Sequence, residues 1–223
     1  MLRNWRLKKI HARFLESCRN LAEGRDYWAR KPGFIQRFLE NLSPVPLLGL
    51  HEEGSRLFEA LRWLELHCKG DALREEHIRQ YHRLISKPGE PTAGEYRRGQ
   101  ATVLDSKVSR PRYEKVAAFM KQLDAKLQHQ QEELDAGNLS DRNTVLRLAL
   151  EIHQRIAFIH PFADGNGRVA RLATNHILRR YGDGYVIFPP LSESPDHFHA
   201  LEEAHLGNLE PLFNFARSCY HAI

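Results

Sequence analysis

The sequence predicts an all-α fold, and three observations support this. Apolar residues recur at helical spacing through most of the chain, proline and glycine clusters interrupt that pattern at only a few places, and β-prone runs are scarce. The chain has 223 residues, of which 42% are hydrophobic and 27% charged. This composition is ordinary for a soluble globular protein, and the length suits one domain or a domain with a helical extension.

The expected helices follow one another with short breaks. Periodic apolar residues indicate helices near 7–15 and 34–39, over 55–67, around 78–84, over 113–134, from Ser140 or Asp141 to Ile159, from the turn at 165–167 to Tyr181, and near 211–220. Arg179 and Arg180 in the last turn complement the helix dipole. Gly182 directly after this turn predicts a left-handed C-cap.

The interval 87–112 is the exception to the helical pattern. It is rich in proline and glycine and contains the short β-prone run 101–104. We interpret it as a loop that carries one small β-hairpin.

Bulk charge and cysteine content exclude several classes of protein. Lys and Arg number 33 and Asp and Glu 28, giving a net charge of +5, but the two signs are interleaved along the chain. This pattern favours solubility over nucleic-acid binding. Cys18, Cys68 and Cys219 are too scattered for a disulfide framework or a zinc site. No apolar run is long enough to span a bilayer, so we expect a cytoplasmic protein without a membrane partner.

The segment 160–171 combines features of a phosphate site. The Gly-Asn-Gly turn at 165–167 lets backbone N–H groups converge on an anion, and the helix that follows adds the positive end of its dipole. Arg168 and Arg171 are three residues apart and project from one helical face. Guanidinium groups match phosphate oxygens in geometry and charge.

Two further residues of this segment suggest chemistry on a bound phosphate. Asp164 precedes the turn and is suited to hold Mg²⁺, which typically takes one or two carboxylates together with phosphate oxygens. His160 exchanges a proton near neutral pH. Each feature alone is commonplace, since a glycine turn is usually only a turn and a lone histidine is usually structural. Their concentration in twelve residues predicts transfer from a nucleotide.

The same residues resemble a known signature, His-x-Phe-x-(Asp/Glu)-Gly-Asn-Gly-Arg-x-x-Arg of the Fic family, at every constrained position. The resemblance implies a Fic-type helical bundle that transfers AMP from ATP. It implies roles as follows: His160 as the general base, Phe162 as a core anchor, Asp164 as the Mg²⁺ ligand, Gly165, Asn166, Gly167 and Arg168 as the phosphate cradle, and Arg171 as the contact of the γ-phosphate.

The resemblance extends beyond the motif. Residues 73–84 and Gly94-Glu-Tyr-Arg97 are similar to the family's approach to its flap, and 207–215 are similar to its closing helix. The family's flap would lie at 98–112 and would dock the target protein by strand addition. We therefore expect a Fic domain over 43–223 and an N-terminal helical extension over 1–42.

Upstream of this region, Gly49-Leu-His-Glu-Glu53-Gly54 resembles the family's inhibitory helix, with Gly49 where the pattern has Ser or Thr. The resemblance implies an inhibitory helix around 47–56 whose Glu53 binds Arg171. A carboxylate there would occupy the place of the γ-phosphate, and the enzyme would inhibit itself.

The resemblance thus implies a protein adenylyltransferase that acts on a Ser, Thr or Tyr hydroxyl of a target protein, with its own chain as a further acceptor. Relatives that transfer other groups tend to replace Gly165 or Gly167, which favours AMP. UMP or GMP transfer, removal of AMP from a target, and a catalytically silent nucleic-acid-binding or scaffold protein remain as alternatives. The target protein, the modified residue and the oligomeric state are open.

Overall fold

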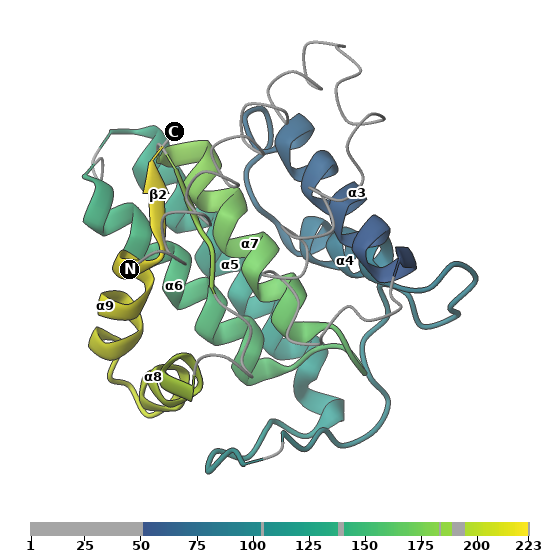
Figure 1. The fold of residues 1–223 in the computed structure, drawn as a ribbon. Helices are drawn as coiled ribbons and strands as arrows, with labels where there is room; N and C mark the ends of the chain where they lie inside the picture. Colours follow the sequence, from purple (N-terminus) through teal and green to yellow (C-terminus); the bar gives the residue numbers. More distant parts are fainter. Residues whose placement is uncertain (1–50, 104, 138–140, 183, 189–194, 223) are drawn as a thin grey trace.

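A computed structural model describes residues 51–223 except 104, 138–140, 183, 189–194 and 223. The elements of the described residues are, in order, α3 (His51–His67), α4 (Glu75–Ile85), the 3₁₀ helix η2 (Tyr113–Lys115), α5 (Val116–Asp135), α6 (Arg142–Ile159), α7 (Asn166–Tyr181), β1 (Gly184–Val186), α8 (Pro195–His205), α9 (Glu210–Ser218) and β2 (Tyr220–Ala222). Helices dominate this part of the chain, which confirms the predicted fold class (Figure 1).

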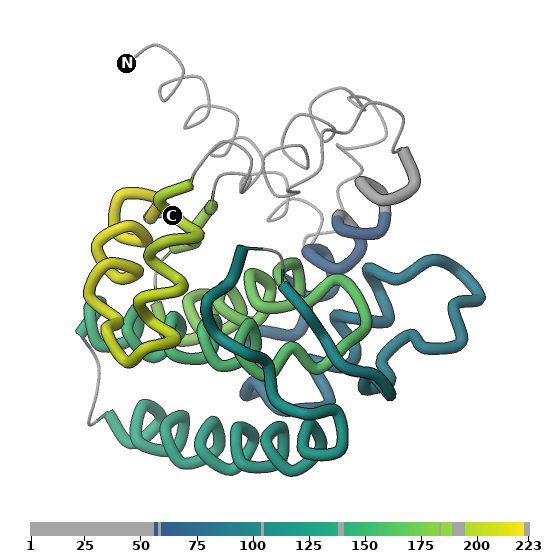
Figure 2. The backbone as a smooth tube through the Cα atoms, turned by 90° about the horizontal axis from the view of Figure 1, so that it is seen from below, coloured from purple at the N-terminus to yellow at the C-terminus, as the bar shows by residue number. Residues whose placement is uncertain are grey.

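Helices α6 and α7 form the centre of the molecule. They pack against each other, and α5 covers one side of α6 (Figures 1 and 2). Helices α3 and α4 lie at one end of the bundle and α8 and α9 at the other. The predicted apolar face of α6 is buried along its whole length and consists of Val145, Leu148, Ile152, Ile156 and Ile159. The connection between α6 and α7, residues 160–165, is therefore held by the most tightly packed pair of helices.

The small sheet lies elsewhere than predicted. Strands β1 and β2 pair antiparallel, with Gly184 opposite Ala222 and Val186 opposite Tyr220. The described residues of 87–112 form turns and bends, so the predicted hairpin at the flap is wrong for this part of the chain. Side chains donate to main-chain carbonyls there, where a hairpin would have a ladder of backbone hydrogen bonds. For example, Gln100 Nε2 donates to Arg110 O at 3.2 Å.

The helix boundaries agree with the periodicity except near the C-terminal end. Asp141 is the N-cap of α6, where its carboxylate accepts from the N–H groups of Asn143 and Thr144. Helix α8 was not predicted, since the sequence there was interpreted as a connection. Gly182 is extended, with φ of −110°, so the predicted left-handed cap is wrong. Glycine is required there for space instead, because a Cβ would lie 2.8 Å from Leu178 O.

Some predictions fall outside the described residues. These are the helices near 7–15 and 34–39, the extension 1–42, and residues 47–50 of the proposed inhibitory helix. The backbone of Glu53 lies in the first turn of α3, but its side chain is not among those described. None of the helices in the described ranges is both long and apolar enough to cross a membrane.

Candidate active site

The chain reverses between α6 and α7 through two left-handed residues. His160 is the C-cap of α6 with φ of 51°, and Gly165 is the N-cap of α7 with φ of 75°. The left-handed region is uncommon for a residue with a side chain and costs free energy that the surrounding packing must offset. The loop places His160 at one end of a tight reversal and the N–H groups of the first turn of α7 at the other.

The buried side chain of Asn166 holds this chain reversal together by hydrogen bonds. It is 3% exposed, its Oδ1 accepts from Phe162 N at 2.9 Å, and its Nδ2 donates to Phe162 O at 2.9 Å. Both polar ends of the side chain are thereby used within the loop. Asn166 was predicted to cradle phosphate, and in the structure its side chain shapes the loop while only its backbone N–H is available at the helix N-terminus.

Phe162 anchors the loop to the core, as the family resemblance implied. Its ring is fully buried and stacks on His82 of α4, with ring centroids 4.0 Å apart and an interplanar angle of 4°. His82 also contacts the loop through Nε2, which lies 3.2 Å from Asp164 O. Burial lowers the pKa of His82 below its ordinary value. The sequence pattern alone gives His82 no role beyond that of a core histidine.

The two glycines of the motif have different surroundings. A Cβ on Gly165 would lie 3.0 Å from Ile85 Cδ1, so the end of α4 packs directly on this position. A Cβ on Gly167 would meet nothing within 4 Å. Gly165 is therefore needed for backbone conformation and close packing, whereas Gly167 faces open space at the start of α7.

Asp164 and the two arginines bring both signs of charge to this end of α7. Arg168 Nη2 lies 3.1 Å from Asp164 Oδ2, and the Asp164 side chain is 91% exposed. Arg171 is one turn further along and only 6% exposed. Burial, with a contribution from Arg168, lowers the pKa of Arg171 to about 10. Arg168 lines the adjacent cavity and Arg171 does not, so the convergence of the two arginines on one phosphate site stays a prediction.

A cavity of about 320 Å³ opens beside these residues. The motif contributes Ala163, Asp164, Gly165 and Arg168 to its lining, and α3, α4 and the following segment contribute Arg56, His82, Ile85, Ser86, Lys87, Glu90 and Thr92. Cations outnumber acids in the lining, which contains the three cationic side chains of Arg56, Lys87 and Arg168 and two carboxylates. A positive cavity at a helix N-terminus is suited to bind an anion.

His160 lies at the other end of the loop. Its Nδ1 is 3.4 Å from Ala157 O, and burial lowers its pKa below the ordinary value, with Arg110 and Arg97 adding to the effect. The imidazole is therefore neutral at physiological pH and able to accept a proton. With the proton on Nδ1, directed at Ala157 O, Nε2 is the accepting nitrogen.

Comparison with known proteins identifies this arrangement. Residues 72–178 match the Fic/DOC family, and this range contains the whole loop, both arginines and His82. The chain belongs to the Fic family. A curated relative from Nematostella vectensis, named protein adenylyltransferase Fic, is 30% identical over 179 residues, covering 76% of this chain and 38% of that protein. The chain thus spans well under half of the relative's length.

Solved structures agree with the Fic fold. A Fic domain containing signaling protein from Bacteroides thetaiotaomicron has a TM-score of 0.61 and 29% identity, and the match covers 75% of this chain and 68% of that one. BepC from Bartonella tribocorum, solved with bound AMPPNP, has a TM-score of 0.54 and 16% identity, with 76% and 89% covered. The latter likeness concerns the fold alone.

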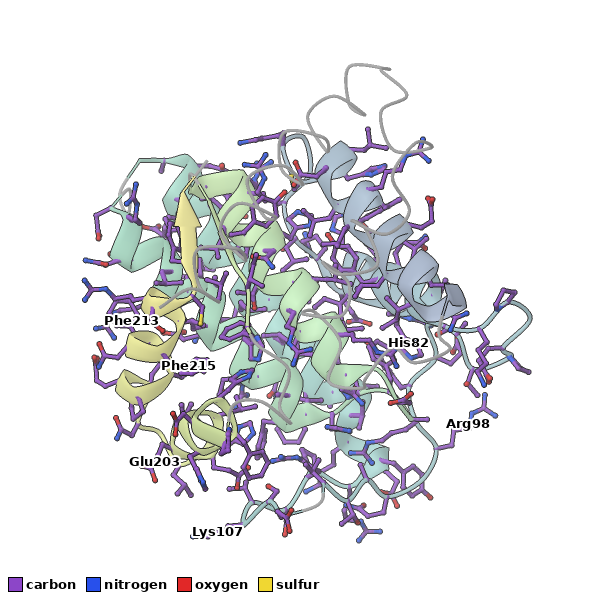
Figure 3. The ribbon with its side chains drawn as sticks, in the orientation of Figure 1. His82, Arg98, Lys107, Glu203, Phe213 and Phe215 are labelled. Atoms are coloured by element: carbon purple, nitrogen blue, oxygen red, sulfur yellow. The ribbon has the colours of Figure 1, made fainter. Side chains whose placement is uncertain are left out.

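In this Fic domain the segment 98–112 is attached to the body at its root and near its tip. At its root, Arg97 Nε donates to His160 O at 2.7 Å and Nη1 donates to Gly99 O at 2.7 Å. Near its tip, Glu202 of α8 accepts from Ser106 Oγ and from Lys107 N, each at 2.8 Å. Figure 3 shows His82 on the α4 side of the molecule and Lys107 close to α8. The segment therefore spans the active-site face of the domain.

The residues that sequence reasoning missed carried only weak signals. His82 is adjacent to the apolar face of α4, where a histidine is usually a core residue. Arg97 belongs to the stretch that resembles the family, but the pattern implied no role for it. Glu202 lies on α8, a helix that was itself not predicted. Within the described residues, no three His, Cys, Asp or Glu side chains cluster in a way that would hold a metal ion by themselves.

Proposed function

We propose that this chain is a protein adenylyltransferase that transfers AMP from ATP to a Ser, Thr or Tyr hydroxyl of a target protein. The observation that carries the proposal is the positively charged cavity at the start of α7, next to Asp164 and Arg168 and a short loop away from the neutral His160. The relative's name and the AMPPNP bound by BepC support a nucleotide donor.

In the proposed reaction the target hydroxyl oxygen attacks the α-phosphorus of ATP. His160 Nε2 takes the hydroxyl proton. The bond between the α-phosphorus and the oxygen that it shares with the β-phosphorus breaks, and pyrophosphate leaves. Such transfer depends mainly on positioning and on stabilisation of charge. The N–H groups of the first turn of α7 and the guanidinium of Arg168 would bind phosphate oxygens, while Arg171 would reach the γ-phosphate.

Asp164 fits the Mg²⁺ ion that this chemistry uses. Its carboxylate is 91% exposed at the edge of the cavity, and a carboxylate oxygen is the ligand that Mg²⁺ prefers. Since Mg²⁺ usually keeps several waters and shares phosphate oxygens, a single protein carboxylate suffices. The ion would neutralise charge on the phosphates and fix their orientation.

Two further assignments belong to the proposal. The segment 98–112 would dock the target, because it spans the active-site face next to His160. The Fic domain would begin near residue 43 and include an inhibitory helix around 47–56, with 1–42 as an extension. Helix α3 begins at His51 and packs against α7, which supports a place for Glu53 near the second arginine of the motif.

The direct test is incubation with α-labelled ATP and Mg²⁺. We expect label on the protein or on a target in a lysate, and none with His160→Ala. Labelled UTP and GTP in parallel decide the donor, and a pre-modified target decides whether AMP is removed. Absence of both label and nucleotide binding in a folded wild-type chain would reject the enzyme and leave a scaffold protein.

The inhibitory role of Glu53 has its own test. Glu53→Gly should raise self-modification, because the γ-phosphate would no longer compete with a carboxylate for Arg171. Glu59→Gly on the same helix is a control for the loss of a charge and of helix propensity. Equal activity of wild type and Glu53→Gly, with both folded, would contradict autoinhibition.

A further inference from the structure

We propose that His82 is a positioning residue that holds the main chain of Asp164 and joins two parts of the cavity lining through one imidazole ring. The inference rests on the proposed function for its consequence in nucleotide binding. Its structural part concerns contacts that exist in the free chain.

The ring of His82 is used on three sides. One face stacks on Phe162 at 4.0 Å, Nε2 lies 3.2 Å from Asp164 O, and Nδ1 lies 2.8 Å from Gly94 N. A backbone N–H can only donate and a carbonyl can only accept. Nδ1 must therefore be the acceptor and Nε2 the donor, which fixes the ring as the neutral tautomer with its proton on Nε2.

The bond from His82 fixes the main chain of Asp164 but leaves its carboxylate exposed. Its carbonyl oxygen is bound by His82, and the next residue, Gly165, has Ile85 Cδ1 at 3.0 Å from the place of a Cβ. Its carboxylate remains 91% exposed and contacts Arg168. The loop between α6 and α7 thus packs on α4, which fixes the position of its main chain. A metal ion would therefore bind an Asp164 carboxylate whose main chain is already held in place.

A second part of the cavity lining, residues 87–92, is connected to the same ring. Gly94 donates its N–H to His82 Nδ1, and its carbonyl accepts from Arg79 Nε at 2.7 Å. The segment that leads to Gly94 contributes Lys87, Glu90 and Thr92 to the cavity lining. One side chain therefore sets the position of the loop on one side and the end of this segment on the other.

Side chains that keep half of the contacts make the proposal testable. His82→Asn places an amide oxygen near the position of Nδ1 and can accept from Gly94 N–H, but it does not reach Asp164. His82→Gln places an amide NH₂ near the position of Nε2 and can donate to Asp164 O. His82→Ala loses both bonds and the stacking. His129→Ala, on the exposed side of α5, is the matched control.

The first measurement is amide hydrogen exchange of the free chain, resolved at Gly94 and in the loop 162–168. We expect faster exchange at Gly94 in the Ala and Gln variants but not in Asn, and faster exchange in the loop in Ala and Asn but not in Gln. Wild-type protection at both places in the Ala variant, with the same melting temperature, would overturn the proposal.

The second measurement is the affinity for a non-hydrolysable ATP analogue with and without Mg²⁺. The gain in affinity caused by Mg²⁺ should fall about tenfold or more in the Ala and Asn variants and should be largely retained in Gln, since misplacement of a ligand by about 1 Å has effects of this size. An equal gain in all four folded variants would contradict the positioning role. If the wild type bound no analogue, the proposed function would be rejected, and the exchange pattern alone would decide the role of His82.

Discussion

Arg97 Nε donates a hydrogen bond to the main-chain oxygen of His160 at 2.7 Å. The same guanidinium donates to Gly99 O at 2.7 Å and to Pro111 O at 2.5 Å, so it also ties together the two ends of the segment 98–112. The carbonyl of Ile159, at the negative end of the α6 dipole, lies 3.4 Å from Nη2. One buried cation therefore links the proposed general base to the proposed docking segment.

Replacement of Arg97 by Ala should harm both stability and transfer. Several buried carbonyls would lose a charged donor, and we expect a loss of about 3 kcal/mol in the free energy of unfolding. Transfer should fall about tenfold or more, because His160 would lose a constraint on its left-handed backbone. Urea unfolding and labelled-ATP assays measure the two effects.

The neighbouring Arg98 is the matched control for this prediction. It is exposed and points away from the body of the domain in Figure 3. Arg98→Ala should leave the unfolding midpoint within error of the wild type. Similar losses in the Arg97 and Arg98 variants would show that the chain merely needs positive charge there.

The two motif glycines should respond differently to alanine. Gly165→Ala must adopt φ of 75° and push against Ile85, so we expect a loss of about 2 kcal/mol in the free energy of unfolding. Gly167→Ala should fold normally, since a Cβ there meets nothing within 4 Å, but its methyl group would stand in the first turn of α7, whose N–H groups are proposed to bind phosphate. Thermal melts and nucleotide titrations separate the outcomes, and a destabilised Gly167→Ala with intact binding would refute this assignment.

Asn166 should behave as a structural residue whose loss also abolishes binding. Asn166→Ala leaves Phe162 N and O without their partner, and a buried unpaired polar group costs about 1–3 kcal/mol. The free energy of unfolding should fall by that amount, and nucleotide affinity should fall with it because the reversal would open. Asn143→Ala, on the exposed start of α6, is the control that should change neither quantity.

Buried neutral histidines should make the fold sensitive to acid. His197 is 2% exposed and its ring lies parallel to those of Phe188 and Phe215, with centroids 4.4 Å and 5.4 Å away. Neither of its ring nitrogens has a hydrogen-bond partner among the described residues. Burial, with Arg171 adding to it, lowers its pKa to about 3. Burial lowers the pKa of His176 to about 4.

The sign of the effect follows from proton counting. Below pH 6.5 the unfolded chain binds protons at these histidines and the folded chain does not, so the free energy of unfolding falls as the pH falls. Each histidine lowers the free energy of unfolding by about 1.4 kcal/mol for each pH unit below 6.5, until the pH reaches its pKa in the folded chain. His197→Phe removes one such contribution.

Urea titrations at pH 7 and pH 5 provide the measurement. Relative to the wild type, His197→Phe should gain about 2 kcal/mol more at pH 5 than at pH 7, and any cost of the larger ring cancels in this difference. His129→Phe, on the exposed side of α5, should show no such difference. A wild type that is equally stable at both pH values would contradict the prediction.

Much of this molecule could be predicted because its elements are governed by local rules. The apolar spacing of α6, its Asp141 cap and the end of the helix at the His160-Pro161 step are all visible in the sequence. The motif placed His160, Asp164 and Arg168 around one reversal because only six residues separate α6 from α7. Close spacing in the chain enforces proximity in space there.

What could not be predicted depends on contacts between distant segments. The sequence suggested a small hairpin within 87–112, but Arg97 and Gln100 donate to carbonyls of that segment, those of Gly99, Arg110 and Pro111. Gly182 looked like a left-handed cap, yet Leu178 O is what requires a glycine. His82 looked like an ordinary core residue, and only its pairing with Asp164 across 82 positions of sequence gives it a role.

The closure of Asn166 onto Phe162 also bears on how the protein ages. An Asn-Gly pair such as 166–167 is prone to deamidation, because the following backbone nitrogen can attack the side-chain carbonyl carbon. Here both amide atoms of Asn166 are bound to Phe162, and Gly167 lies within the first turn of α7. This geometry keeps the carbonyl carbon away from that nitrogen. Deamidation would replace the donor facing Phe162 O with a carboxylate, so the hydrogen bonds that shape the site also protect it from this chemical damage.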